Sequence, residues 1–343
     1  MEAEGLFNAV CFLKAHVFKE TTMKKTLIAL AVLAASGAAM AQSTAQVYGL
    51  ADVWFGNTKA GAPGAKVSTT QLTSGGLNQS RWGIQGSEDL GGGLKAVFKL
   101  EQGFNLDNGT TAAANTAFSR QAYVGLAGGF GQVVLGNAWT AMDDIFGASN
   151  SGFDSALSAT NNVWVASATY SSNPGNTIKY NSPAFSGLTF GASYSLDENA
   201  AVSRDIVDFS VSYAAGPVAA NFAYQVQNNA VDTKVTTLNG SYDLGVAKLL
   251  ASYARTDAAG VKSNDYQIGA DVPLSSALTL SAGYASSKTT ATARKANGWG
   301  VALGYALSKR TTVYGGLRDS TVKTAGVTTN ESTTYAVGLR HTF

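Results

Sequence analysis

The side chains that most often perform catalysis or bind metals are nearly absent from this chain. It has one cysteine, Cys11, and two histidines, His16 and His341. Cys11 and His16 precede Gln42, where we expect the mature chain to begin, so that chain would keep one imidazole and no thiol. Disulfides, thiolate nucleophiles and metal sites built from His and Cys are therefore excluded. We expect no cofactor and no enzymatic activity, because a lone imidazole cannot assemble a histidine-based triad.

Charged side chains are the other candidates for chemistry, and the chain carries few of them. They make up 13% of the residues, which is about half the share in an ordinary soluble domain. Lys and Arg number 24 against 22 Asp and Glu, and removal of residues 1–41 leaves 20 against 19. This balance argues against a polybasic nucleic-acid binder and against an acidic tail protein.

Two-residue alternation of apolar and polar side chains runs through the chain from about Thr44 to Phe343. One block extends from Val207 to Tyr213, a turn follows at residues 214–217, and the next block begins at Val218. Such blocks are typical of strands joined as up-and-down hairpins. The mean hydropathy is +0.03, and no apolar run reaches the roughly 18 residues of a helical span. A transmembrane antiparallel β-barrel fits both facts, because its lipid-facing and lumen-facing residues alternate.

The size of the barrel follows from the length of the chain. Removal of residues 1–41 leaves 302 residues, and at roughly 19 residues per strand and connection they form about 16 strands. A barrel of that size keeps an aqueous channel, whereas eight strands would be filled by side chains. The lumen-facing positions carry mainly Ser, Thr, Asn, Gln and Gly, which indicates a wet interior.

The first 41 residues resemble an export signal. Met23, Lys24 and Lys25 supply a positive start, residues 26–35 an apolar stretch, and residues 39–41 a small-residue cleavage site. We expect a signal peptide that is cleaved after Ala41 and a single barrel domain over residues 42–343. The apolar stretch is shorter than a spanning helix, which is the alternative. Residues 1–22 either lie upstream of the true start at Met23 or belong to a longer targeting segment.

Arg81 lies in a stretch, SRWGIQGSEDLGGGLKA, whose alternation sets the face that it occupies. The pattern places Arg81 on the face opposite Trp82, and an arginine on the lipid face would cost about 2–4 kcal/mol near the membrane centre. Arg81 is therefore expected in the lumen. No helix follows the glycine triplet, so it is not a phosphate-binding loop. The other charges expected to face the lumen nearby are Lys95, Lys99, Glu101 and Arg120.

Four stretches, in this order, carry a resemblance to a known family. They are SRWGIQGSEDLGGGLKA, SRQAYVGLAGGFGQVVLG, TIKYNSPAFSGLTFGASYS and YAVGLRHTF. Together they resemble the general trimeric porins of the Gram-negative outer membrane, and the resemblance covers essentially the whole mature chain. It implies an all-β barrel, a homotrimer, and a third extracellular loop that folds into the barrel and narrows it.

By this resemblance the loop before Thr177 forms a pore constriction with the barrel wall. Opposed charges there set a field that orients solutes and filters ions. Some relatives carry a further arginine before this strand, but the chain reads SATYSSNPGN there, so the implied anion preference is weak. We expect Lys179, which has lumen parity, to take the place of that arginine in part. The residues implied at the constriction are Arg81, Arg120, Lys95, Lys99, Glu101 and Lys179 on the wall and Asp143, Asp144 and Asp154 in the loop.

Plainer roles remain open for these charges. The two arginines could be ordinary lumen charges away from the constriction, and the lysines, together with Lys248, could only keep the lumen hydrated. Asp143 and Asp144 could cap a short loop helix or lie exposed. A calcium site at these two carboxylates lacks the alternating acidic ligands that such sites use.

The last nine residues alternate up to the terminal carboxylate. One face of this final strand carries Tyr335, Val337, Leu339, His341 and Phe343. An alternating final strand with a terminal aromatic resembles the signal that the outer-membrane assembly machinery reads.

The predicted function is that of an outer-membrane porin. It would form a water-filled channel for passive diffusion of ions and small hydrophilic solutes, with outer-membrane lipid and the assembly machinery as its other partners. The alternatives are a substrate-selective channel of the same fold and a plugged barrel with an adhesive or structural role.

Overall fold

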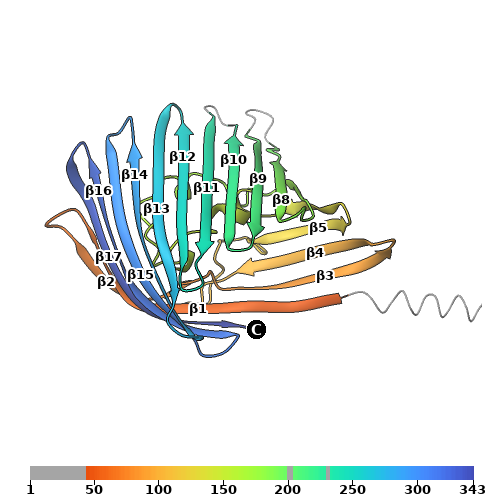
Figure 1. Ribbon diagram of the computed structural model, residues 1–343, viewed down its shortest axis with the longest axis horizontal. Coiled ribbons are helices and arrows are strands. Elements are labelled where there is room, and N and C mark those ends of the chain that lie inside the picture. The colour runs from red at the N-terminus through yellow and green to blue at the C-terminus, as the bar shows by residue number, and fades with distance from the viewer. Residues whose placement is uncertain (1–43, 199–203, 229–231) are drawn as a thin grey trace, which may run out of the picture.

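The computed structural model describes residues 44–198, 204–228 and 232–343, which form one antiparallel barrel (Figure 1). The expected signal peptide and its cleavage site lie outside these residues. Pairing between β1 (Thr44–Gly61) and β17 (Val327–Thr342) closes the sheet on itself, with Leu50 opposite Thr342 and Gly61 opposite Glu331. No helix within the described residues is long and apolar enough to cross a membrane.

The remaining elements follow one another around the barrel. The strands of the first half are β2 (Val67–Ser74), β3 (Arg81–Gly91), β4 (Leu94–Gly103), β5 (Gln121–Gly128), β6 (Gly131–Asn137), β7 (Thr177–Asn181) and β8 (Leu188–Ser195). Those of the second half are β9 (Ile206–Ala215), β10 (Val218–Gln227), β11 (Thr233–Asp243), β12 (Lys248–Ala258), β13 (Val261–Pro273), β14 (Leu278–Thr289), β15 (Arg294–Ala306) and β16 (Thr311–Thr324). The short helical segments are α2 (Asp143–Phe146), η2 (Gly152–Asp154) and η3 (Ala166–Ala168).

Two of the strands share one place in the wall. β1 pairs with β2 through residues 53–60 and with β3 through residues 44–50. Residues 75–80, which connect β2 to β3, leave the wall between these two pairings. The 17 strands of the sheet therefore occupy 16 positions, which confirms the predicted barrel.

Alternation along each strand separates a lipid face from a lumen face. On β9, Val207 and Phe209 are each 44% exposed, whereas the intervening Asp208 and Ser210 are only 2% and 6% exposed. The apolar side chains point outward, where lipid replaces water, and the polar side chains point into the barrel.

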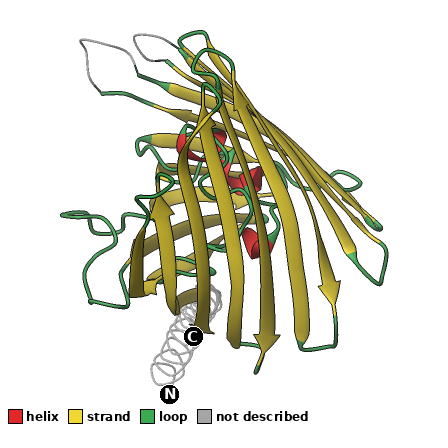
Figure 2. Ribbon diagram, turned by 90° about the vertical axis from the view of Figure 1, so that its left-hand side faces the viewer, coloured by secondary structure: helices red, strands yellow, loops and turns green. Residues whose placement is uncertain are grey.

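The two rims differ in the length of their connections. One rim carries the chain's C-terminus and short turns such as residues 216–217 and 274–277. The other carries residues 104–120 and residues 138–176, named loop L3 here. Barrels of this class have short periplasmic turns and longer extracellular loops, so L3 is the third extracellular loop. Figure 2 shows its helical segments inside the barrel.

Candidate functional site: the pore constriction

Loop L3 is bound along the inner wall of the barrel by polar side chains of the strands. In the first half of the loop, the backbone N–H of Met142 donates to Asp208 of β9 at 3.0 Å, and that of Ser151 donates to Gln267 of β13 at 3.0 Å. On its return, the N–H of Ala166 donates to Asp265 of β13 at 2.8 Å. The loop therefore crosses several strands twice and is folded inward, as expected.

Glycines on the inner wall let the loop approach the strands closely. Gly269, Gly283 and Gly300 are register partners on β13, β14 and β15. A Cβ at Gly283 would lie 1.9 Å from Ser151 Oγ, and one at Gly300 would lie 2.2 Å from the carbonyl oxygen of Leu157. Any side chain in this row would displace the loop, so the position of L3 depends on glycine here.

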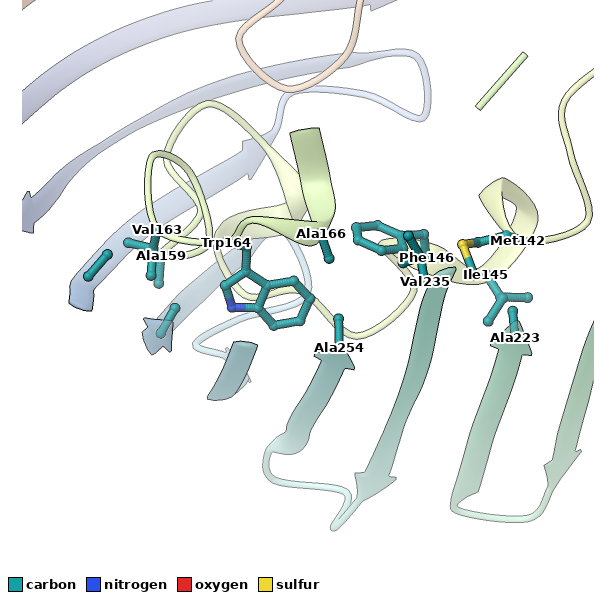
Figure 3. Packing of buried hydrophobic residues seen from close by; sticks show 12 residues of the cluster. Met142, Ile145, Phe146, Ala159, Val163, Trp164, Ala166, Ala223, Val235 and Ala254 are labelled. Atoms are coloured by element: carbon teal, nitrogen blue, oxygen red, sulfur yellow. The ribbon is translucent and has the colours of Figure 1, made fainter. Parts of the chain in front are cut away.

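An apolar cluster holds the base of the loop against small wall residues. Met142, Ile145, Phe146 and Trp164 of L3 pack towards Ala223, Val235 and Ala254 of the strands (Figure 3). Phe146 stacks on Tyr170 with ring centroids 4.1 Å apart and meets Trp164 edge-on at 6.1 Å. The aromatic residues of the loop thus form a core between L3 and the wall.

A second inward segment, residues 75–80, depends on a buried carboxylate that the sequence did not single out. Asp52 of β1 is fully buried. Its carboxylate accepts the backbone N–H groups of Gly76, Leu77 and Asn78 at 2.8–3.0 Å. It also accepts the hydroxyl of Tyr314 of β16 at 2.5 Å. Asp52 therefore fixes this segment inside the barrel.

The tip of L3 is joined to this second segment. The N–H of Ala156 donates to the carbonyl of Gly76 at 2.8 Å. Beside this bond, Leu77 and Leu157 pack with Trp54 and Tyr314. L3 and residues 75–80 are consequently one connected structure, and a cavity of about 410 Å³ lies between them. Asp143 and Asp154 are among the residues that line it.

A cluster of cations surrounds Glu101, whose side chain points into the barrel and is almost fully buried. Its carboxylate lies 2.8 Å from Arg120 Nε, 3.6 Å from Arg81 Nε and 3.7 Å from Lys99 Nζ. The hydroxyl of Tyr48 donates to the same carboxylate at 2.8 Å. We call these four charged residues the Glu101 cluster.

Arg120 precedes β5, so strand alternation does not set its direction. Its Nη1 hydrogen-bonds Gln79 of the inward segment, and its guanidinium lies 4.8 Å from the ring centroid of Trp139. The N–H of Arg120 also donates to the carbonyl of Glu101 at 3.2 Å. Arg120 thus links the Glu101 cluster to residues 75–80 and to the start of L3.

The three acidic residues of the loop have different partners. Asp144 forms an ion pair of 2.5 Å with Lys179, which is 6% exposed on β7. Asp143 accepts the hydroxyl of Tyr170 at 2.9 Å, and Asp154 accepts the amide of Asn150 at 2.8 Å. Burial raises the pKa of Asp143 to about 6. Burial raises the pKa of Asp154 in the same way, also to about 6.

Of the two plain roles suggested for Asp143 and Asp144, the structure does not show the helix cap, whereas Asp144 does lie exposed. Both lie in the first turn of α2, but its N-cap is Met142 and no side chain caps it. Asp144 instead neutralises Lys179, so Lys179 does not add an unpaired cation to the lumen.

Lys95 is separated from the other predicted residues. It is exposed near the periplasmic end of β4, opposite Asp89, and four residues along a strand place it roughly 13 Å from Lys99. Arg340 of β17, which was not among the predicted residues, lies closer to the site because its Nη1 donates to Asn78 at 2.8 Å. Arg340 is on the face opposite Leu339, so alternation could have identified it.

The final strand presents its predicted face outward. Tyr335, Val337, Leu339 and Phe343 are 44–54% exposed, and His341 hydrogen-bonds Thr311 through Nδ1 at 3.0 Å. The Phe343 ring lies over Gly49, where a Cβ would come within 2.2 Å of it.

Comparison with known proteins agrees with this architecture. A protein-family model described as Gram-negative porin matches residues 26–325 of this chain. An outer membrane porin protein of Delftia acidovorans is 36% identical over 362 residues, covering 94% of this chain and 100% of that protein. One of Bordetella pertussis is 30% identical over 388 residues, with the same coverage.

Solved structures show the same fold. An anion-selective porin from Comamonas acidovorans has a TM-score of 0.76 at 29% identity, covering 88% of this chain and 100% of that chain. An outer membrane protein of Vibrio cholerae in its trimer form has a TM-score of 0.68 at 17% identity, over 88% and 100%. This chain belongs to the Gram-negative porin family, and is therefore an outer-membrane β-barrel channel and not an enzyme.

Proposed function

We propose that the channel passes ions and small hydrophilic solutes by passive diffusion, with a weak preference for anions. The Glu101 cluster carries this proposal, because Arg81, Lys99 and Arg120 share a single carboxylate. Three cations against one anion leave the wall positive where it meets the lumen. The similarity to an anion-selective porin supports the same sign.

Loop L3 limits the strength of that preference. Asp144 is paired with Lys179, but Asp143 and Asp154 line the cavity without a cation among their hydrogen-bond partners in the described residues. At neutral pH their carboxylates oppose the positive wall. Opposed charges across a narrow passage filter ions and orient dipolar solutes without any chemical step.

Removal of the two arginines tests this proposal. In planar bilayers under a salt gradient, Arg81→Gln combined with Arg120→Gln should move the reversal potential towards cations, because Lys99 and Glu101 then cancel and the cluster loses its net positive charge. Lys95→Gln is the matched control, since it removes a lumen-parity cation away from the cluster. If the double variant kept the wild-type reversal potential, the constriction would lie elsewhere.

We further propose three properties that the N-terminal sequence pattern and the family resemblance imply. The channel is a homotrimer, which the trimer form of the Vibrio cholerae structure supports at the level of fold. The mature chain begins at Gln42, and the final strand, ending in Phe343, is read by the assembly machinery. The mass of the folded complex, the N-terminal sequence of the exported protein and the assembly yield of Phe343→Ala test these three statements.

A further inference from the structure

Three lysines form a row across the outer face of the barrel. Lys288 of β14 is the register partner of Lys295 of β15, and Lys295 is the register partner of Lys323 of β16. All three are exposed. They follow the parity of outward residues on their strands, namely Tyr284 on β14, Trp299 on β15 and Leu317 on β16. Neighbouring strands lie about 4.8 Å apart, so the row spans roughly 10 Å.

No acidic side chain of the described ranges is paired with this row, although Asp319 lies on the same outer face of β16, opposite Trp299. No ion pair joins any of the three lysines to an acidic side chain within the described residues, whereas nearby Lys262 pairs with Asp257 at 3.8 Å and Lys66 pairs with Glu331. Like charges placed directly opposite each other on adjacent strands destabilise a sheet. An anion outside the chain would relieve that repulsion.

The row lies at the depth expected for lipid headgroups. The three lysines stand beside the turns at residues 290–293 and 325–326, on the extracellular rim. Tyr284 and Trp299 are register partners four residues below the row, and they are 48% and 41% exposed. Outward aromatic residues mark the membrane interface in such barrels. Four residues along strands that tilt by about 40° place the lysines roughly 10 Å above the aromatic level, on the side towards the extracellular medium.

An apolar groove begins four residues below the row, at the level of Tyr284 and Trp299. It has a volume of about 620 Å³ and is lined on the outer face by Leu249, Ile268, Ala282, Tyr284, Trp299 and Val301. On the lumen side the same strands are covered by L3, since Ser151 lies against Gly283. The groove therefore opens towards the membrane, and the small side chain of Ala282 lines it two residues from Tyr284.

We propose that this face binds a phosphorylated lipid of the outer leaflet. Its phosphate groups contact Lys288, Lys295 and Lys323, and one acyl chain lies in the groove beside Trp299. A lipid matches both halves of the surface at once: negative charge at the rim and hydrocarbon below it. The inference rests on the outer-membrane location and not on the anion preference of the pore.

Binding of bisphosphorylated lipid A to the refolded full barrel in detergent tests the proposal. The variant is Lys288→Gln combined with Lys295→Gln and Lys323→Gln. Each lysine near an anionic lipid surface contributes about a factor of five, so the triple variant should bind on the order of a hundredfold more weakly. Lys248→Gln with Lys309→Gln and Arg310→Gln removes the same charge from the opposite rim and should bind as the wild type does. Circular dichroism verifies that each variant is folded.

Two further measurements distinguish a lipid phosphate from free phosphate and test the role of the groove. Inorganic phosphate, titrated against bound lipid A, should fail to displace it at matched concentrations, and Trp299→Ala should weaken lipid binding by roughly tenfold. Single-channel conductance of the triple variant should equal that of the wild type, because the lysines lie outside the lumen.

Several results would overturn the assignment. Equal losses in the two triple variants would mean that net charge, and not this row, attracts the lipid. Binding of inorganic phosphate as tight as that of lipid A would make this a free-ion site. A change in oligomeric mass of the lysine variant without lipid would identify the face as a contact between copies of the chain.

Discussion

At the scale of single residues, the pore charge depends on one buried carboxylate. Arg81, Lys99 and Arg120 would repel one another in the absence of Glu101, which lies within 3.7 Å of each of them. A charge with several hydrogen-bonded partners is held in one geometry, so the cations are positioned before any ion arrives. The charge of the loop acids Asp143 and Asp154 varies with pH near neutrality, because burial raises the pKa of each carboxyl to about 6.

Anion preference should therefore increase as the pH falls from 7 to 5. A raised carboxyl pKa means that Asp143 and Asp154 gain protons in this range and lose their negative charge, while the arginines stay charged. The reversal potential under a salt gradient is measured at both pH values. It should move towards the anion side, because each channel loses up to two negative charges. Asp143→Asn with Asp154→Asn should show the low-pH value at pH 7 and little change on acidification. A wild-type shift towards cations would contradict the assignment of these acids to the passage.

At the scale of elements, two segments fold into the barrel, and each depends on specific wall residues. Residues 75–80 depend on Asp52, and L3 depends on the glycine row of β13 to β15. Because the tip of L3 bonds to Gly76, a disturbance of one segment reaches the other.

Asp52→Ala should destabilise the barrel and increase the current noise of the open channel. The substitution leaves three backbone N–H groups and the Tyr314 hydroxyl without their acceptor, at a cost of about 3 kcal/mol in the free energy of unfolding. The measurements are the urea midpoint of the refolded protein and the open-channel noise. Asp89→Ala is the control, since within the described residues the Asp89 carboxylate accepts one hydrogen bond, from the N–H of Gly91 in an exposed turn. If Asp52→Ala behaved as this control does, residues 75–80 would be held by other contacts.

Gly283→Val should reduce the conductance of the open channel. The new side chain would occupy the space of Ser151 and push L3 away from the wall into the passage. Overpacking of this kind costs about 1–3 kcal/mol, so the barrel should still fold. Gly129→Val, at a turn where a Cβ meets nothing within 4 Å, should conduct as the wild type does. An unchanged conductance for Gly283→Val would show that the loop yields outward or was never close to the path.

At the scale of the whole molecule, the barrel could be predicted from the sequence, but the segments that fold into its lumen could not. Alternation identifies strands because every second side chain meets lipid, and this holds for each hairpin after Val207. The stretch GGLNQS breaks the alternation, but a broken pattern does not say whether residues 75–80 turn into the lumen or out of the wall. Asp52 lies on the lumen parity of β1, yet its partners are distant in sequence, so its role required the structure.

At the candidate site, too, some residues could be placed from the sequence and others only from the structure. Glu101 and Lys99 were placed by parity on one strand, whereas Arg120 reaches Glu101 from outside β5, where parity does not apply. The pairing of Lys179 with Asp144 depends on how L3 returns to the wall, which no local pattern records. The lysine row on the outer face likewise requires the register between strands.

The recording of ion currents through the refolded mature chain in a planar bilayer under a salt gradient tests the central claim most directly. We predict conductance steps in groups of three and a reversal potential on the anion side, because a trimer of open barrels has a positive wall at each constriction. The absence of steps from protein that circular dichroism shows to be folded β-structure would contradict an open pore. Steps with a reversal potential on the cation side would contradict the role assigned to the Glu101 cluster.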